Sequence, residues 1–458
     1  MEGDDVINEE TKAGERKYEE KVVVIGGGWA GCAAALEAVK KGCETTLIEK
    51  TDLLLGLGNV GGIMRNNGRY TAAEENIAMG AWELFEITDR LSTHRNVNFP
   101  GHEHASFYDV AFVEPEVRRL LIKKGVKIFF CTRVTGISVG NGKSTDAPRN
   151  IKSVTAVVHN KDGSLTEKQF SGDVFIEATG STGPMGNCAK YGNGCSMCIL
   201  RCPAFGPRVS ITQLAGGDDV YGLRKDGTPG AFSGSCKLEK RTLSVDIQKK
   251  LEREGFCVIP LPAHLVNKGK LGQKVCQQYA LEQFAENLIL IDTGQAKLMT
   301  SYFNLEELRT IEGFENAGYA DPYAGGKANS VRYMSVGHRD EYMRAVNVGG
   351  ICNLLLAGEK SGFFVGHTEA ITTGTLAGYN GAMLSKGKPP LSITRELAIG
   401  DFLSFTKEAM AQEDGMSRRF TFAGGEYFER MKEKGLYTIN TDEIEKRVYK
   451  AGLLHIYK

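Results

Sequence analysis

The chain has 458 residues, which is long enough for two or three domains and a sizeable core. Its 56 basic and 56 acidic residues give a formal net charge of +0, so no overall field attracts nucleic acid or an anionic membrane. No apolar run reaches the length of a membrane span, and the polar stretch 1–20 lacks the apolar core of a signal peptide. We therefore expect a cytoplasmic protein with a disordered leader over residues 1–20, no membrane contact and no nucleic-acid partner.

The first organised stretch is an apolar run over 22–25 that leads directly into a glycine-rich loop. The run predicts a buried strand, and Gly26, Gly28 and Gly31 follow it with the spacing G-x-G-x-x-G. A glycine permits the tight turn at the first position, lets backbone approach a pyrophosphate at the second, and lets a helix pack closely at the third. The context between a strand and a helix favours a dinucleotide site over an ordinary glycine turn.

An alanine-rich helix is expected over 32–40, followed by a second strand over 45–48. That strand ends in Glu49, eighteen residues after the last glycine, where an acid can accept hydrogen bonds from a ribose. The helix N-terminus offers free N–H groups and a positive dipole end to phosphates. The residues predicted to bind the dinucleotide here are Gly26, Gly28, Trp29, Ala30, Gly31, Glu49 and Lys50.

The next stretch, 51–62, is again rich in glycine, and Gly62 is a candidate ligand contact beside the nucleotide loop. A solvated connection is the alternative interpretation. Helical patterns then cover 72–91 and 114–124. Strands are expected over 125–130, 151–160 and 168–176, the last two around a turn at Asp162–Gly163. The last strand ends in Ala178-Thr179-Gly180.

A strand ending in Ala-Thr-Gly after such a β-meander resembles the two-dinucleotide-binding-domain flavoproteins of the glutathione-reductase type. The block Gly350 to Glu359, followed by Gly366-His367 and a helix over 371–384, resembles the closing part of the same family. The resemblance implies FAD as cofactor, with Glu359 near the ribityl chain and the helix N-terminus aimed at the pyrimidine end of the flavin. It adds these expected FAD contacts: Thr179, Gly180, Gly358, Glu359, Gly366 and His367.

A narrower resemblance covers 308–316, 332–339 and 357–380, which are similar to the glucose-inhibited-division and folate-dependent tRNA-uridine methyltransferase flavoproteins. Those enzymes use paired cysteines near the flavin. Cys257 matches one of the pair, but the stretch after Glu49, where the other would lie, contains no cysteine. The same family match marks Cys257, His338 and Arg339 as expected catalytic, substrate-facing residues. For Cys257 and His338, ordinary packing in the protein core is the alternative.

Four of the eleven cysteines fall within fifteen residues, directly after the Ala-Thr-Gly strand. The ending C-x2-C-x3-C-P matches the bacterial ferredoxin pattern, although glycine stands at the usual first ligand position, so a more distant cysteine must complete the set. We expect a [4Fe–4S] cluster, with a structural zinc site or reactive or buried thiols as the alternatives. The expected metal ligands are Cys188, Cys195, Cys198 and Cys202.

The sequence thus predicts an α/β fold with a Rossmann-like FAD-binding domain and β-meander, interrupted by an inserted α+β substrate domain and followed by a small helical tail. The expected limits are 21–205 with 345–390 for the FAD-binding domain, including the cysteine cluster at 188–203, then 206–344 for the inserted domain and 391–458 for the tail.

The expected function is an iron–sulfur flavoprotein oxidoreductase that transfers electrons between FAD, the cluster and a small organic substrate. Its electron carrier would be NAD(P)H or a ferredoxin. One alternative is an RNA-uridine methyltransferase that uses reduced folate and FAD, and the missing cysteine and the neutral charge speak against it. The other alternative is a non-catalytic electron-relay subunit of a larger redox complex. The tail suits a homo-oligomer or such a complex.

Overall fold

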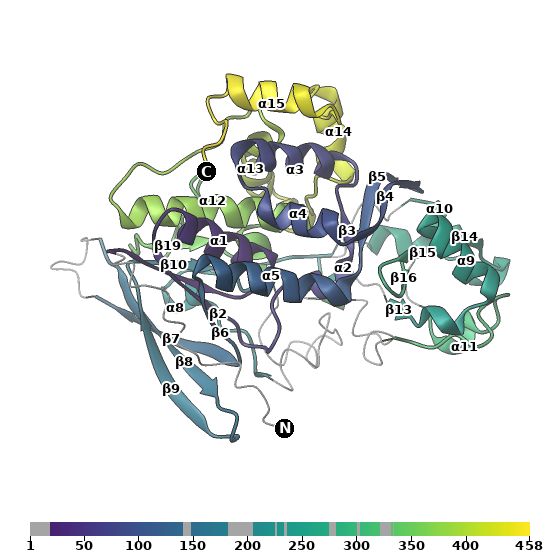
Figure 1. Cartoon of the computed structure of the whole chain (residues 1–458), viewed down its shortest axis with the longest axis horizontal. Helices are drawn as coiled ribbons and strands as arrows, with labels where there is room; N and C mark the ends of the chain where they lie inside the picture. Colours follow the sequence, from purple (N-terminus) through teal and green to yellow (C-terminus); the bar gives the residue numbers. More distant parts are fainter. Residues whose placement is uncertain are drawn as a thin grey trace.

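The computed structural model describes residues 19–140, 148–181, 205–224, 227–232, 236–273, 281–299, 303–320, 331–332 and 334–458. The expected leader falls outside these residues, except for its last two positions. Figure 1 shows a layered centre, an antiparallel sheet at lower left, an inserted region at right and the C-terminal helices at the top.

The centre is a parallel sheet with the strand order β19-β10-β1-β2-β6. The valine run of the first strand is buried, as expected for a strand that is covered on both faces. In register, Val24 lies between Ile176 and Leu47. The bounds are β1 (Lys21–Ile25), β2 (Glu44–Ile48), β6 (Lys127–Phe129), β10 (Val174–Glu177) and β19 (Leu354–Leu356). This sheet and its helices confirm the predicted α/β fold.

Two helices, α1 (Trp29–Lys40) and α12 (His367–Ser385), pack against each other on one face of this sheet. Their backbones almost touch, since a Cβ on Gly374 would lie 2.2 Å from the carbonyl oxygen of Ala30. A Cβ on Gly378 would lie 2.3 Å from the carbonyl oxygen of Ala34. The alanines of one helix and the glycines of the other are therefore explained by close helix packing. The helix α5 (Val110–Lys124) packs beside α1.

The expected β-meander is present as an antiparallel sheet of β7 (Thr132–Val139), β8 (Ile151–His159) and β9 (Leu165–Ser171). The expected strand over 168–176 is in fact two strands, because the chain leaves the meander after Ser171 and enters the central sheet as β10. The expected helix over 72–91 is likewise divided into α3 (Gly68–Met79) and α4 (Glu83–Arg90). Gly80, with a φ of +103°, ends the first of them.

The inserted region contains a second antiparallel sheet, in the order β13-β16-β15-β14. This region has its own apolar core, whose residues fall within the sequence range 238–319. A separate aromatic cluster joins it to the sheet β3-β5-β4, with Phe99 and Phe107 on one side and Phe284 on the other. The bounds are β3 (Ile63–Met64), β4 (Ser92–Phe99), β5 (His102–Tyr108), β13 (Cys236–Leu238), β14 (Phe256–Pro260), β15 (Asn287–Asp292), β16 (Ala296–Leu298), α9 (Val245–Glu254), α10 (Gln283–Glu286) and α11 (Leu305–Leu308).

The expected domain limits stay predictions. Several short elements connect the parts described above. These elements are α2 (Gly58–Gly61), α8 (Ile211–Leu214), the pair β11 (Val220–Tyr221) with β18 (Ser335–Val336), the pair β12 (Ala231–Phe232) with β17 (Val331–Arg332), and the 3-10 helices η1 (Lys240–Thr242), η2 (Ala263–Leu265), η3 (Lys268–Gln273), η6 (Gly358–Ser361) and η7 (Gly415–Ser417).

The C-terminal part is helical, as expected, and forms α13 (Ala398–Met410), α14 (Gly425–Glu433) and α15 (Thr441–Lys450). It is tied to α3 through Glu75, whose carboxylate accepts the N–H groups of Ala398 and Ile399 at 2.8 and 2.9 Å. Burial raises the pKa of Glu75 to about 7, and these two N–H donors oppose that rise.

Candidate functional site

The first glycine turn, Gly26–Gly31, follows β1 and begins α1. It is closed tightly at one point, because a Cβ on Gly31 would lie 1.7 Å from the carbonyl oxygen of Gly26. It is open at another, because a Cβ on Gly28 would meet no atom within 4 Å. Among the described residues, no side chain caps the N-terminus of α1. The turn therefore leaves space and helix N–H groups for a phosphate.

Glu49 lies directly after β2 and is 8% exposed. One carboxylate oxygen accepts the N–H of Gly27 at 2.6 Å, and the other accepts the N–H of Thr51 at 2.9 Å. The second oxygen also accepts the hydroxyl of Thr51 at 3.0 Å, so the oxygen that faces Gly27 is the one that can accept a further hydrogen bond, as a ribose hydroxyl would require. The neighbouring Lys50 donates to the carbonyl of Gly206 at 2.9 Å, so its ammonium group holds the chain that follows the cysteine segment.

The Ala-Thr-Gly turn after β10 and the Glu359 turn lie side by side. Ser181 donates its hydroxyl to Glu359 at 2.7 Å. Arg208 donates to the carbonyl of Gly180 at 3.1 Å and to the hydroxyl of Thr179 at 3.3 Å. Among the described residues, a Cβ on Gly180 would meet no atom within 4 Å, so they leave this turn open as well. Gly358 is closed instead, because its Cβ would lie 2.7 Å from that of Ala30.

The N-terminus of α12 meets the second glycine turn, which consists of α2 and Gly62. The hydroxyl of Tyr108 and Nδ1 of His367 are 3.0 Å apart. A Cβ on Gly61 would lie 1.8 Å from the imidazole carbon of His367, and a Cβ on Gly58 would lie 2.4 Å from Nε1 of Trp29. Burial, together with the charges of Arg69 and Lys297, lowers the pKa of His367 to about 3, so this imidazole is neutral.

These residues fit FAD. The two open positions at Gly28 and Gly180 lie on adjacent strand ends of one parallel sheet, where doubly wound folds bind dinucleotides. The uncapped start of α1 suits the pyrophosphate, and the N-terminus of α12 suits negative charge on the flavin. The side chains of Trp29 and Ala30 are buried, at 3% and 5% exposed, and their contacts with the cofactor stay predictions.

A buried ion pair that the sequence analysis missed stiffens the start of α12. Arg69 donates to both carboxylate oxygens of Glu369 at 3.0 and 3.1 Å and to the carbonyl of Val365 at 2.8 Å. Glu369 also accepts the N–H of Phe422 at 2.9 Å. A Cβ on Gly366 would lie 2.2 Å from the guanidinium of Arg69, so the pair directly supports the predicted flavin contact.

A second missed feature is a charge cluster beneath the Ala-Thr-Gly turn. Lys360 is fully buried between the carboxylates of Glu177 and Asp219, and Arg208 lies 3.1 Å from Asp219. Burial alone would raise the pKa of the Asp219 carboxyl, but Lys360 and Arg208 outweigh it and hold the pKa below its usual value. Two positive and two negative groups balance there, so the cluster ties η6 to the sheet without a net charge.

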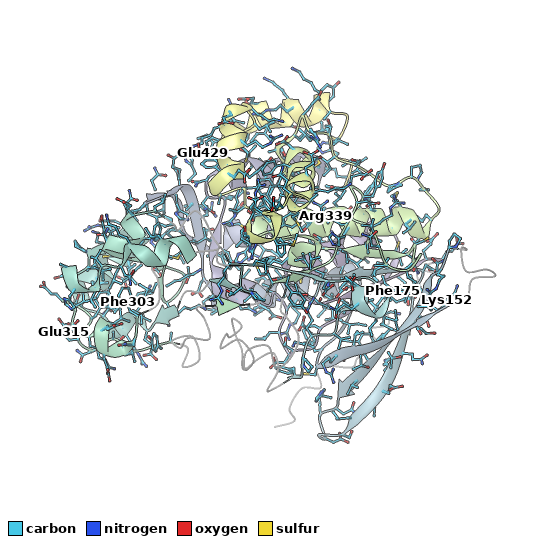
Figure 2. The ribbon with its side chains drawn as sticks, turned by 180° about the vertical axis from the view of Figure 1, so that it is seen from behind. Lys152, Phe175, Phe303, Glu315, Arg339 and Glu429 are labelled. Atoms are coloured by element: carbon cyan, nitrogen blue, oxygen red, sulfur yellow. The ribbon has the colours of Figure 1, made fainter. Side chains whose placement is uncertain are left out.

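Three residues expected to face the substrate have different surroundings. Cys257 lies on β14 and is 3% exposed in the core of the inserted region, and burial raises the pKa of its thiol. His338 is half-buried next to Arg339. Arg339 lies in the middle of the molecule (Figure 2), where its guanidinium donates to the carbonyls of Ser361 and Leu403. Burial lowers the pKa of Arg339 to about 10. Their catalytic roles stay predictions.

The expected metal ligands Cys188, Cys195, Cys198 and Cys202 lie outside the described residues. Within the described ranges, no group of histidine, cysteine and acidic side chains could hold a metal ion. In the same ranges, every helix is too short or too polar to cross a membrane.

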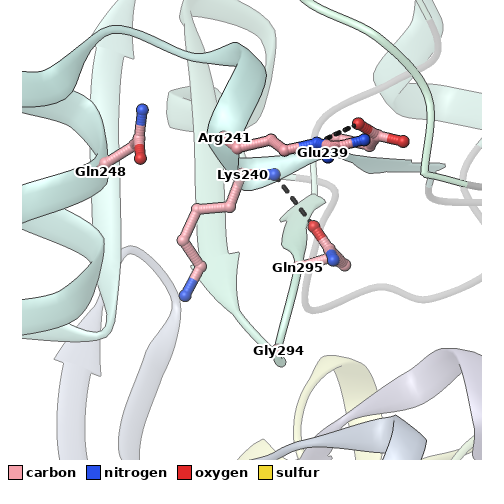
Figure 3. Close-up of a pocket in the computed structure, with 6 residues that line it drawn as sticks. All are labelled: Glu239, Lys240, Arg241, Gln248, Gly294 and Gln295. Carbon is pink, nitrogen blue, oxygen red and sulfur yellow. Dashed lines mark hydrogen bonds and ion pairs between the residues drawn. The ribbon is translucent and has the colours of Figure 1, made fainter.

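The inserted region has a polar pocket of about 390 Å³ (Figure 3). Its charged groups are already paired, since Lys240 lies 2.8 Å from Asp292 and Arg241 lies 2.9 Å from Glu239. Gln295 accepts the backbone N–H of Lys240 at 2.9 Å. These pairings leave no net charge with which to select an ionic ligand. The lining residues are Glu239, Lys240, Arg241, Gln248, Gly294 and Gln295.

The fold and the two glycine turns are those of a flavoprotein, with an expected FAD site on two separate chain segments. A family model described as "Glucose inhibited division protein A" matches residues 21–300 and 280–389. The chain therefore belongs to the glucose inhibited division protein A family and is an FAD-dependent oxidoreductase. This confirms the family resemblance seen in the sequence.

Solved structures agree with this fold. The chain is similar to GidA of Aquifex aeolicus in its form II crystal, with a TM-score of 0.60 and 15% identity over 94% of this chain and 76% of that one. For the form I crystal, the TM-score is 0.58 and the identity 14%, over 94% of this chain and 78% of that one. At this identity, the likeness concerns the fold.

Proposed function

We propose that this chain passes electrons between FAD, a small organic substrate bound at the inserted region, and a [4Fe–4S] cluster held by Cys188, Cys195, Cys198 and Cys202. FAD supplies two-electron chemistry, and the cluster supplies single-electron transfer to a carrier such as a ferredoxin. NAD(P)H is the alternative carrier. We further propose a cytoplasmic location and assembly as a homo-oligomer or within a redox complex.

The observation that carries this proposal concerns the two ends of the cysteine segment. Ser181, just before the segment, donates to Glu359 at 2.7 Å. Arg208, four residues after the undescribed stretch 182–204, donates to Gly180 and Thr179. Both ends are thus fixed to the predicted flavin contacts. With its ends held there, the segment could bring a cluster to FAD, as electron transfer requires.

In this arrangement, the residues of the chain act by position and charge. The turn at Gly28 and the start of α1 would bind the pyrophosphate, and Glu49 would accept a ribose hydroxyl. Arg69 and Glu369 would keep the start of α12 rigid where it is expected to face the flavin. The neutral imidazole of His367 and the hydroxyl of Tyr108 close the site beside the second turn.

The test is metal analysis of anaerobically purified protein. Wild type should contain about four irons and matching sulfide per chain, and Cys198→Ser should lose them together while it keeps FAD, because oxygen is a poorer ligand than sulfur for this cluster. Cys352→Ser is the matched control, since Cys352 is exposed and lies outside the cysteine segment. Stoichiometric zinc in wild type, or no metal at all, would refute the cluster.

The family favours a second candidate, a folate-dependent modification of RNA uridine. Two observations speak against it. No cysteine occurs between Asp52 and Asn67, and Cys257 is buried in the core of the inserted region. Incubation of unmodified transfer RNA with the protein, methylene-folate and NADPH should yield no 5-methyluridine. If 5-methyluridine forms, this candidate replaces the first.

A further inference from the structure

The second glycine turn, Gly58–Gly62, is gripped by donors from other parts of the chain. The hydroxyl of Tyr108 donates to the carbonyl of Gly58 at 3.3 Å, and its backbone N–H donates to that of Gly62 at 3.1 Å. Lys237 donates to the carbonyl of Asn59 at 2.9 Å, and Lys297 donates to that of Gly61. Two ammonium groups therefore lie at the C-terminal end of this turn, where helix carbonyls carry partial negative charge.

Both lysines come from the inserted region. Lys237 lies on β13 and Lys297 on β16, which are neighbours in the same sheet. Lys297 is only 6% exposed, between two residues of the apolar core, Ala296 and Leu298. Alternation along the strand places its side chain on the opposite face of the sheet, toward the second turn. The inserted region therefore contributes buried positive charge to the edge of the FAD domain.

The second glycine turn links Lys297 to the start of α12 through Gly61. Gly61 accepts from Lys297 and also presses against the imidazole of His367, the first residue of that helix. Thr293 packs on the neighbouring residue, because a Cβ on Gly62 would lie 2.4 Å from its methyl carbon. The charge of Lys297 also contributes to the lowered pKa of His367. The ammonium group thus acts at the helix end expected to face the flavin pyrimidine ring.

We propose that Lys297, assisted by Lys237, is a positioning residue through which the docked inserted region stabilises reduced FAD. Two-electron reduction with uptake of one proton leaves a net negative charge on the bound flavin, and nearby positive charge favours that state. The electrons and the proton come from the reductant. The proposal depends on FAD binding and holds whether or not the cysteine segment carries a cluster.

The test compares FAD midpoint potentials by dithionite titration in the full chain. Lys297→Met should weaken the binding of reduced relative to oxidised FAD at least tenfold, which lowers the two-electron potential by about 30 mV. Lys297→Arg keeps the charge and should retain most of the wild-type potential. Lys240→Met is the matched control, because Lys240 lies in the same region but pairs with Asp292 instead of the turn.

Lys237→Met serves as a second variant. The side chain of Lys237 is half-buried, so its loss disturbs the fold less than the loss of Lys297 does. This variant should shift the potential in the same direction by a smaller amount. An unchanged potential in both methionine variants, with FAD still bound, would overturn the proposal. An equal weakening of the binding of oxidised and of reduced FAD would also overturn the proposal, because it would show that the lysines only hold the turn in shape.

Discussion

The two glycine turns of this protein are both expected to contact the cofactor, but they are built in opposite ways. Gly26–Gly31 is held by its own backbone and by Glu49, and it has open space at Gly28. Gly58–Gly62 is held by Tyr108 and by two lysines from the inserted region. The first turn can bind phosphate by itself, whereas the second depends on distant parts of the chain. Substitutions in the two turns should therefore fail in different ways.

The largest expected effect is that of Gly31→Ala. The added methyl group would lie 1.7 Å from the carbonyl oxygen of Gly26, and neither backbone segment can move away without distorting β1 or α1. We expect a loss of about 3 kcal/mol or more in the free energy of unfolding, with little folded protein recovered. Urea unfolding without cofactor measures this. A variant as stable as wild type would contradict the tight closure of the first turn.

The same methyl group at Gly28 should affect binding alone. It meets no protein atom within 4 Å, and the φ of −65° at this position suits any residue. Gly28→Ala should therefore unfold like wild-type apoprotein but bind FAD at least tenfold more weakly, about 1.4 kcal/mol, because the methyl group occupies the space for the pyrophosphate. Flavin fluorescence titration checks this. Unchanged affinity would place the pyrophosphate elsewhere.

Gly61→Ala should have an intermediate effect that depends on a distant residue. Its methyl group would lie 1.8 Å from the imidazole of His367, which is the end of a side chain and can move. We expect a destabilisation of about 1–3 kcal/mol. A double-mutant cycle with His367→Ala should recover much of that loss, since the smaller side chain removes the clash. Strictly additive effects would show that the second turn and α12 are not coupled.

The last expected effect is a change in the pH dependence of stability. The pKa of His367 falls from its ordinary value of 6.5 to about 3 in the folded protein, so the unfolded chain binds more protons between these values. Its contribution to stability is therefore present above pH 6.5 and is lost as the pH falls toward 3. In His367→Asn, stability should fall less steeply over pH 6.5 to 4. Parallel curves for the two proteins would show that His367 titrates normally.

The sequence predicted the first turn because its signal is local. Gly26, Gly28, Gly31 and Glu49 lie within one strand–helix–strand unit, and their spacing in that context indicates a dinucleotide site. The family resemblance also identified the closing strand and α12. The strands and helices of both predictions are present in the central sheet and in the packing of α1 against α12, whereas the individual cofactor contacts stay predictions.

The second turn could not be predicted in the same way. Lys237 and Lys297 contact residues 178 and 236 positions away, and no spacing in the sequence indicates such pairs. The cluster of Lys360 with Glu177 and Asp219 likewise joins distant segments. Arg339 shows the converse difficulty. An arginine in a family motif suggests a substrate contact, whereas here it donates to backbone carbonyls in the interior.

The central claim is that this chain binds FAD across the two turns and the start of α12. The most direct measurement is the flavin released on denaturing the purified full chain, identified by chromatography and counted per polypeptide. The account predicts about one FAD per chain in wild type and little in Gly28→Ala at the same protein concentration. A wild-type chain that contains no flavin and takes up none when FAD is supplied would contradict it.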